Sequence, residues 1–413
     1  MAPVLSRNQK IGLALSCMLI TEEKRRKKRK IWAKQWLHDR KRFTHLNLLK
    51  ELDESDFRNF LRMDEQCFTD LLYMVKPFIE KKNTLFRSSV SAEERLIVTL
   101  RYLATGRSYE DLKFSAAISP QLLSSIIPET CAAIYHCLKK YIKIPKTEDE
   151  WRTVAHQFET KWNFNNAVGA MDGKHIAIQK PTGSGSQYYN CKTFFSIVLF
   201  AIVDANYQFM YVNVGANGSV CDSTVLQNSS FYQRLINDEL RLPAPTALPG
   251  TNKCIPYVFL GDSGFSLSPY IMKPYPLKNI THGQRIFNCR LSRARRVVEN
   301  AFGILASRFR VFLQAIAINV ENVEVVVLAC CALHNYLSQR NAMYITPSSV
   351  DTEDVNTMQL RPGDWREVRP LAPMQQSSVR TVSKQGKNIR KCFLDYYNDK
   401  GALTFQEDML RAQ

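Results

Sequence analysis

Apolar side chains between residues 56 and 150 recur every three or four positions, which is the period of amphipathic helices. One helix is expected over residues 92–103, and Ser108 begins another with a sequence typical of a capping box. Pro120 opens a third, which Pro128 is expected to kink or break. Three helices joined by short turns predict a helix-turn-helix whose last helix enters the major groove. A helical bundle with a purely structural role explains the same pattern.

The pattern changes after residue 160, where short continuous apolar runs alternate with turns. Such runs predict buried strands, and a renewed period near 3.6 predicts helices. Strands are expected over residues 167–171, 193–203, 207–214 and 257–260, and helices over residues 222–236, 285–309 and 320–337. Three strands, a helix, a strand and further helices follow the order of a ribonuclease-H-like α/β core. The expected fold is therefore α/β, with this core preceded by an all-helical, helix-turn-helix-like domain.

The C-terminal region of the chain lacks this regular hydrophobic pattern. Residues 341–388 are polar and contain several prolines, so they are expected to form a mobile linker before a short helix at 388–397. These patterns together divide the chain into four predicted regions. They are a basic segment (1–55), a helical DNA-binding domain (56–160), a nuclease-like domain (161–340), and a polar linker with the C-terminal tail (341–413).

The net charge of the chain indicates which class of partner it favours. Lys and Arg number 56 against 38 Asp and Glu, a net charge of +18 with a pI near 9.4. This excess favours nucleic acid or an anionic membrane surface as a partner, although a basic protein without a polyanionic partner has the same composition. The densest basic run contains Lys27, Lys28, Arg29 and Lys30. We interpret it as a nuclear import signal and a DNA contact; a solvated helix face is the alternative.

Membrane, disulfide and zinc chemistry fit the chain less well. The apolar run at residues 11–20 is too short to span a bilayer, so no membrane partner is expected. The 11 cysteines form no Cys-x-x-Cys pair, which favours a reducing compartment over a disulfide framework. Cys330, Cys331 and His334 lie together on an apolar stretch that we interpret as a buried helix rather than a zinc site.

Three acids stand where a carboxylate is costly without a compensating cation. Asp172 and Asp262 each follow an apolar strand, and Glu299 is the only acid among six arginines between residues 288 and 310. Strands one and four are neighbours in the expected core, so Asp172 and Asp262 would lie side by side. Carboxylate oxygens suit Mg²⁺ or Mn²⁺, and two such ions support cleavage of a phosphodiester bond. Asp222 begins a helix near the same edge and is a candidate fourth ligand.

Each acid also has an ordinary explanation. Glu299 lies one turn after Arg295 and Arg296 and could simply pair with them. Asp262 and Asp172 precede or adjoin glycines, as turn aspartates do, and Asp222 could be a helix N-cap. The ordered set, with Glu299 placed 37 residues after Asp262, is what favours a metal site. His175 and His334 could orient a ligand or DNA, although a core or surface role explains both.

Four segments resemble the motifs of the PIF/Harbinger transposases and of the host nucleases derived from them. They are Met-Asp-Gly-Lys-His-Ile from Met171, Val-Cys-Asp-Ser-Thr from Val220, Leu-Gly-Asp-Ser-Gly-Phe from Leu260, and Arg-Val-Val-Glu-Asn-Ala-Phe-Gly from Arg296. The resemblance implies a DDE triad of Asp172, Asp262 and Glu299, with Asp222 as a further metal-binding acid. It also implies a divalent cation, a nuclear location and a separate Myb-like or SANT-type partner protein.

The preferred hypothesis is therefore a metal-dependent DNA nuclease of the transposase type. Asp172, Asp222, Asp262 and Glu299 would bind the metal, and Arg290, Arg293, Arg295 and Arg296 would hold phosphates. The alternative is a domesticated DNA-binding or adaptor protein whose acidic site is silent. A phosphohydrolase acting on another substrate would fit the metal site but leaves the net charge unexplained. Whether transposition survives and whether the chain forms a homo-oligomer stay open.

Overall fold

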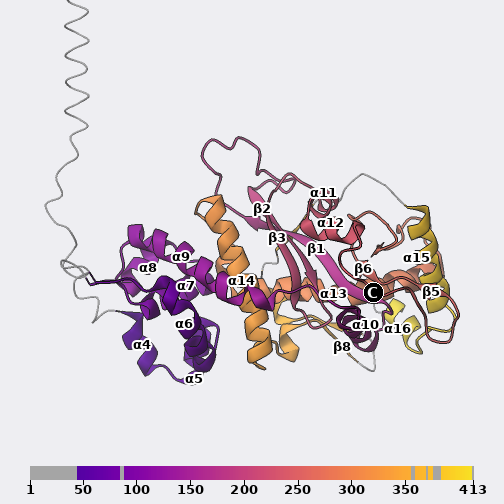
Figure 1. Ribbon diagram of the computed structural model, residues 1–413, viewed down its shortest axis with the longest axis horizontal. Coiled ribbons are helices and arrows are strands. Elements are labelled where there is room, and N and C mark those ends of the chain that lie inside the picture. The colour runs from indigo at the N-terminus through magenta and orange to yellow at the C-terminus, as the bar shows by residue number, and fades with distance from the viewer. Residues whose placement is uncertain (1–43, 84–87, 355–358, 369–370, 375–382, 412–413) are drawn as a thin grey trace, which may run out of the picture.

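The computed structural model describes residues 44–83, 88–354, 359–368, 371–374 and 383–411. The predicted basic contacts Lys27, Lys28, Arg29 and Lys30 lie outside these residues. The described chain is a mixed α/β protein with a helical part at one end and a sheet covered by helices at the other (Figure 1).

Six helices form the helical part. They are α4 (His45–Glu51), α5 (Glu54–Leu61), α6 (Glu65–Ile79), α7 (Ala92–Thr105), α8 (Tyr109–Ala116) and α9 (Pro120–Leu138). Side-chain caps begin several of them: Ser91 and Glu94 make a capping box at α7, and Ser108 accepts from the Asp111 N–H at α8. The expected break at Pro128 is wrong, because α9 continues through it to Leu138.

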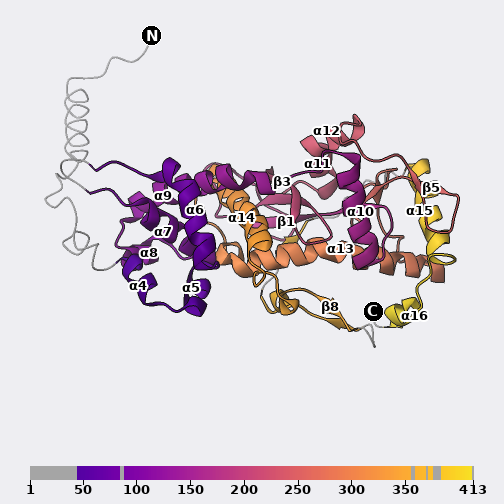
Figure 2. The same ribbon diagram turned by 60° about the horizontal axis from the view of Figure 1, so that its bottom comes forward.

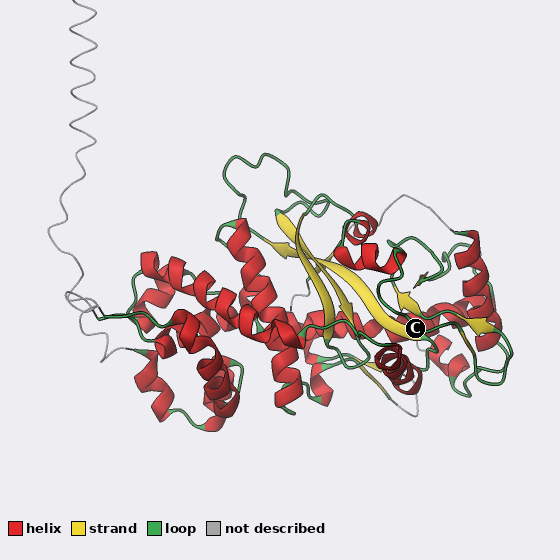
Figure 3. Ribbon diagram, in the orientation of Figure 1, coloured by secondary structure: helices red, strands yellow, loops and turns green. Residues whose placement is uncertain are grey.

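The sheet follows the order β3-β2-β1-β6-β7, and β10 pairs with the far part of β1 (Figure 3). Its strands are β1 (Ala167–Ala177), β2 (Ser196–Val203), β3 (Phe209–Asn217), β6 (Val258–Leu260), β7 (Ile271–Met272) and β10 (Ala372–Pro373). The first three are antiparallel neighbours, whereas β6 runs parallel to β1. Every residue of β2 is buried, because helices cover both faces of this central strand. The predicted adjacency of the first and fourth strands is confirmed.

Helices on the sheet fix the acidic residues. α10 (Glu148–Trp162) and the long α13 (His282–Arg308) pack against β1. The expected helix at 222–236 is two short helices, α11 (Asp222–Gln227) and α12 (Ser230–Ile236), because Asn228 caps the first and Ser229 caps the second. The turn η2 (Arg310–Leu313) follows α13. Two-residue strands β4 (Thr246–Ala247) and β5 (Cys254–Ile255) form a small hairpin outside the main sheet.

Helix α14 (Val320–Arg340) joins the two parts of the molecule. It packs against α9 on one side and β3 on the other, and the Tyr336 hydroxyl donates to the Cys67 carbonyl 3.1 Å away. Its length and hydropathy would also suit a membrane span, but 67% of that window is buried inside the protein. Cys330, Cys331 and His334 have no exposed surface, so the predicted buried helix is confirmed. One apolar core therefore extends from the helical part into the sheet.

The expectation of a mobile linker over 341–388 is wrong for most of the residues there that the structure describes. Trp365, in the turn η4 (Asp364–Glu367), is buried against Gly303 of α13, and its indole N–H donates to Asn300 Oδ1 at 2.9 Å. Strands β8 (Thr352–Glu353) and β9 (Leu360–Arg361) form a hairpin near α13 (Figure 2). The short turn η3 is Pro347–Ser349. Helix α15 (Lys384–Tyr397) also packs on α13, followed by α16 (Gln406–Arg411). Composition alone missed these isolated anchors.

Candidate active site

The register of the sheet brings Asp172 and Asp262 together. Ala170 of β1 pairs with Leu260 of β6 in parallel, and each aspartate stands two residues beyond this pair. Asp172 does not end its strand as expected; β1 continues to Ala177. Because side chains alternate along a strand, Asp172 and Lys174 project from the same face of β1. The acid therefore has a cation beside it that the shorter predicted strand did not include.

Asp172 is neutralised within the protein. Its side chain is 4% exposed, its Oδ2 lies 2.7 Å from Lys174 Nζ and 3.7 Å from Arg295 Nη1, and its Oδ1 accepts from the Gly173 N–H. Lys174 also lies over the Phe302 ring, at 5.8 Å from the centroid. A buried carboxylate needs such partners to remain charged. Lys174 and Arg295 thus occupy the role that a metal cation would take.

Asp222 is the least satisfied acid of the group. It is 2% exposed, and its Oδ1 has no hydrogen-bond partner among the described residues. A Cβ at Gly173 would lie 2.4 Å from this oxygen, so the glycine permits the close approach of β1 to α11. Burial, followed by repulsion from Asp172 and Asp262, raises the pKa of Asp222 to about 9. Cys221, not Asp222, is the N-cap, so capping does not explain this aspartate.

Asp262 lies in the same negatively charged environment as Asp172 and Asp222. Its Oδ1 accepts from the Gly264 N–H at 2.8 Å, and Ser223 Oγ donates to the Gly264 carbonyl at 2.6 Å. The loop after β6 is therefore tied to the start of α11. Burial, followed by the charge of Asp172, raises the pKa of Asp262. Three carboxyl groups thus influence one another across the β1 and β6 strand ends.

Glu299 reaches the group through Arg295. The two side chains form an ion pair one turn apart on α13, as the ordinary explanation predicted, and Arg295 also faces Asp172. Burial alone would lower the pKa of Arg295, but the charges of Glu299 and Asp172 outweigh it and raise this pKa above its usual value. The Glu299 side chain is 30% exposed, in contrast to the buried aspartates. Arg295 therefore links Glu299 to Asp172 instead of holding a phosphate.

The fit to a divalent cation is partial. Four carboxylates supply hard oxygen ligands, and the unpartnered Asp222 Oδ1 and the raised pKa of Asp262 show excess negative charge that a cation would relieve. As the side chains lie, no three His, Cys, Asp or Glu residues in the described part of the chain are arranged to hold a metal. Metal binding would require Lys174 and Arg295 to release Asp172.

The other predicted phosphate contacts face inward, which corrects the expectation for them. Arg290 is 2% exposed, and its guanidinium donates to the carbonyls of Asn163 and Gly401. Arg293 and Arg296 both form ion pairs with Glu353 of β8. The arginines do lie on one helix, α13, as the sequence predicted. Their spacing could not show that the segment after α14 returns to cover them.

The two histidines differ in their surroundings. His334 is buried, with Nδ1 3.1 Å from the Tyr344 hydroxyl and Nε2 2.9 Å from the Tyr207 carbonyl, which fits a core role. His175 is 2% exposed; its Nδ1 lies 3.0 Å from Ser196 Oγ, and its Nε2 has no partner among the described residues. Burial, followed by Lys192, lowers the pKa of His175 to about 4. It is therefore a neutral ring three strand positions beyond Asp172, on the opposite face of β1 from Asp172 and Lys174.

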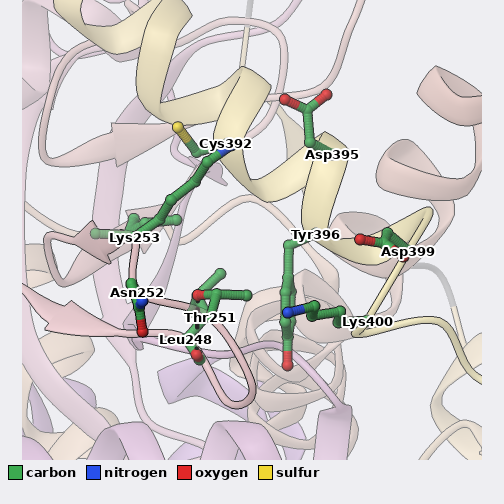
Figure 4. Close-up of a pocket in the computed structure, with 10 residues that line it drawn as sticks. Leu248, Thr251, Asn252, Lys253, Cys392, Asp395, Tyr396, Asp399 and Lys400 are labelled. Carbon is green, nitrogen blue, oxygen red and sulfur yellow. Dashed lines mark hydrogen bonds between the residues drawn. The ribbon is translucent and has the colours of Figure 1, made fainter.

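A separate hollow lies beside the helix α15 and does not include these acids. Its volume is about 370 Å³, and Figure 4 shows it between α15 and the loop that joins β4 to β5. Lys253 and Lys400 line it together with Asp395 and Asp399, and Lys400 Nζ donates to the Gly250 carbonyl at 2.6 Å. Its charges are of both signs, so it serves as the seat of α15 rather than as a second acidic or basic site.

The fold and the acidic group define a class of protein. A mixed sheet that gathers aspartates from two adjacent strands, with a glutamate on a crossing helix, is the arrangement of a DDE-type nuclease domain, and residues 171–335 match the DDE superfamily endonuclease family. Over these residues the chain is similar to the DDE superfamily endonucleases, and over a longer stretch it is similar to proteins named ALP1-like and HARBI1. The resemblance read from the four motifs is thereby confirmed.

The relatives cover most of the described chain. The chain is 28% identical over 298 residues to the ALP1-like protein of Arabidopsis thaliana, across 69% of this chain and 71% of that protein. It is 25% identical over 265 residues to HARBI1 of Bos taurus, which is named as a nuclease provisionally, across 63% of this chain and 71% of the relative. HARBI1 of Homo sapiens is 25% identical over 250 residues, across 60% and 67%. No solved structure matches the chain.

Proposed function

We propose that this protein is a divalent-metal-dependent DNA nuclease of the Harbinger type, with a ribonuclease-H-like core. The observation that carries the proposal is the group of buried Asp172, buried Asp222 and half-buried Asp262, with an unpartnered oxygen on Asp222. DDE superfamily endonucleases generally use divalent metals, and the relatives named as nucleases support the same reaction class.

The side chains divide the work as follows. Asp172, between β2 and β6, and Asp262 would hold the cation from adjacent strands, and Asp222 would add its free Oδ1. Glu299 would complete the site from α13 once Arg295 turns away from it. When bound, Mg²⁺ or Mn²⁺ supplies charge neutralisation at the attacking and leaving oxygens of the phosphodiester. Lys174, released from Asp172, would face the phosphate as a nearby positive charge.

The test is an assay on linear and supercoiled DNA with Mg²⁺, Mn²⁺ or chelator. Asp262→Asn should abolish metal-dependent cleavage and leave DNA binding in place, because it removes ligand charge without changing the shape of the side chain. Asp149→Asn is the matched control, since that carboxylate is 90% exposed on α10. Cleavage by Asp262→Asn at the wild-type rate would contradict the assignment.

A second candidate is a domesticated DNA-binding or adaptor protein with a silent acidic site. The observation in its favour is that Lys174 and Arg295 already neutralise Asp172. This candidate expects salt-sensitive DNA binding with no cleavage in any metal, and no rise in melting temperature on addition of Mg²⁺. The nuclease expects both cleavage and a Mg²⁺-dependent rise, because a ligand of the native state stabilises it.

The helix-turn-helix, the nuclear location and the Myb-like or SANT-type partner belong to the same proposal. The link of α8 to α9 spans only residues 117–119, which suits a helix-turn-helix. However, α9 carries no Lys or Arg from Pro120 to Leu138, and its exposed face presents Gln121, Ser124 and Ser125. Phosphate contacts by this domain would therefore come from other elements.

A further inference from the structure

Four arginines line a groove beneath the helical part of the molecule. Its volume is about 610 Å³, and it lies between α5, α7 and the turn η2 that follows α13. Its lining is Leu52, Asp56, Asn59, Phe60, Arg62, Arg101, Thr105, Arg107 and Arg310. We call this hollow the arginine groove. Arg310 is more than 200 residues from the other three arginines in sequence, so only the fold brings it to them.

The charges in the arginine groove are poorly compensated. Burial, followed by repulsion from Arg310, Arg101 and Arg308, lowers the pKa of Arg62, and its buried Nε has no partner among the described residues. Arg101 donates to the Phe60 carbonyl at 3.2 Å rather than to an acid. For Arg310, the described part of the chain supplies no ion-pair partner. Like charges held this close require an anion between them or remain mutually repulsive.

The remaining acids do not cancel this charge. Arg107 pairs with Asp111 at 3.3 Å, but both side chains are about half exposed, at 53% and 52%, so the pair is weak. Asp56 is the one acid in the lining, and its carboxylate stands at an exposed position on α5. Arg62 is held by Asn59, whose side-chain oxygen lies 2.6 Å from Nη1 and carries no charge. The arginine groove keeps a net positive charge.

A second hollow extends the arginine groove. Its volume is about 440 Å³, and it shares Phe60, Arg101 and Arg107 with the first. Leu48 of α4 and Phe114 of α8, at 45% and 66% exposure, form apolar walls farther along. An elongated groove with arginines along it fits several phosphates in succession, whereas a single small anion would fill only one end. Arg guanidinium groups bind phosphate oxygens in bidentate fashion.

We propose that the arginine groove binds the phosphate backbone of the DNA substrate at a position beside the cleavage site. Helix α13 relates the two places, because it carries Glu299 and ends at Arg308, two residues before Arg310 of the groove. The nine residues from Glu299 to Arg308 span on the order of 14 Å along the helix axis. That length corresponds to roughly four nucleotides of one DNA strand. The inference rests on the proposed function, since it assigns the substrate of that function to a second contact outside α9 and outside the acidic residues.

The experiment measures DNA affinity with the full chain in the Asp262→Asn background and with chelator, so that cleavage cannot contribute. A fluorescent duplex of arbitrary sequence is titrated with Arg107→Glu/Arg310→Glu and with the control Arg152→Glu/Arg411→Glu. Both doubles change the charge equally, and the control arginines are also exposed, at 47% and 81%. Circular dichroism and melting temperature establish that each variant folds.

The expected result is a loss of about tenfold or more in affinity for the groove double and a fall of about two in the slope of log affinity against log salt. The control double should lose less than about threefold, and Arg310→Lys should keep the salt slope. Equal losses for the two doubles would overturn the inference. So would tight binding of inorganic triphosphate in the groove that leaves DNA affinity unchanged on saturation, because the ligand would then be a free polyphosphate.

Cleavage by the wild-type protein is scored separately. If DNA binding depends on the arginine groove but Mg²⁺ and Mn²⁺ give no cutting, the nuclease proposal fails and the groove assignment stands. If the protein cuts DNA and the groove double binds and cuts as the control does, the groove assignment fails and the nuclease proposal stands.

Discussion

The acidic site and the arginine groove each collect charges of one sign, one at the middle of α13 and one just beyond its end. In the acidic site, Asp172 and Asp222 are deeply buried, Asp262 is half-buried, and Lys174 and Arg295 are drawn in as counter-charges. In the arginine groove, Arg107 and Arg310 are exposed, so solvent can hydrate and screen their charges. Burial decides the difference, because an uncompensated charge costs far more inside a protein than at its surface.

This difference implies different ligands. A site that already holds its own cations exchanges them for a metal, so its occupant must be small, hard and strongly charged. An open groove with unpaired guanidinium groups accepts a large polyanion without rearrangement. In the proposed function, the acidic site would carry out the cleavage and the arginine groove would bind the DNA backbone. The changes below test that division, beginning with the largest expected effect.

Asp222→Asn should reduce metal-dependent cleavage by about a hundredfold or more, because it removes one carboxylate from the cation site while keeping the shape. DNA affinity should stay within about twofold, since the arginine groove is untouched. Initial cleavage rates and duplex titrations of the same preparation give the two numbers. A parallel fall in both would show that the acidic site also binds DNA and would remove the contrast.

Arg295→Met should lower the free energy of unfolding by about 3–5 kcal/mol in metal-free protein, because Asp172 and Glu299 lose a shared, largely buried counter-charge. Arg295→Lys should restore part of this. Urea unfolding measures the loss, and Mg²⁺ should reduce it by supplying the missing positive charge. A loss under about 1 kcal/mol would mean that Lys174 alone suffices.

The pH dependence of stability should differ between metal-free wild type and Asp222→Asn. The raised pKa, about 9, means that folded Asp222 keeps its proton after the unfolded chain has lost it near the usual value of about 3.9. The stability that this group contributes is complete below about pH 4 and is lost as pH rises towards 9. Asp222→Asn does not titrate. The difference in unfolding free energy between the two proteins should therefore grow steadily with pH, in favour of the variant.

Gly303→Ala should destabilise the protein by about 1–3 kcal/mol, although alanine is the better helix former by about 1 kcal/mol. The new Cβ would lie 2.2 Å from the Trp365 ring, so that ring must leave α13. Thermal unfolding and tryptophan fluorescence report the change. Since α13 carries Glu299 and leads to Arg310, this substitution perturbs the spacing of both regions. An unchanged or raised melting temperature would show that Trp365 adapts without cost.

Arg310→Ala should change stability by less than about 0.5 kcal/mol, and in the direction of greater stability. The side chain is exposed, and its charge repels Arg62. The expected change in the free energy of unfolding has the opposite sign to that of Arg295→Met, because the two arginines stand in opposite charge environments. Urea unfolding at low and high salt measures it, because screening should remove the gain. A clear loss of stability would mean that Arg310 has a structural partner.

Sequence patterns anticipated the elements better than their extents. The strands around Asp172 and Asp262 and their adjacency were predictable, because continuous apolar runs between turns have few other solutions. The continuation of β1 through Lys174 was not, since Asp, Gly, Lys and His interrupt the apolar run. The result was that Lys174, the nearest cation to Asp172, was missed. The alternation of a strand three residues longer would have revealed it.

The arginines of α13 show the opposite error. Their clustering predicted a phosphate-binding face, yet Glu353 and the Asn163 carbonyl take up Arg293, Arg296 and Arg290. Glu353 lies in a polar, proline-containing segment that composition assigned to a linker. A few anchors such as Trp365 hold that segment, and one buried side chain among many polar ones leaves no periodic signal.

The sequence by itself determined the element types, the neighbouring strands and the ordered acids whose motifs resemble those of the harbinger-derived proteins, because hydrophobic period and short motifs are local properties. Only the tertiary structure decided which charges meet. It set Lys174 and Arg295 against Asp172, left Asp222 Oδ1 unpartnered, and assembled the arginine groove from α5, α7 and η2. The physical reason is that charge compensation depends on distance and burial in three dimensions, and neither is encoded in the spacing of residues along the chain.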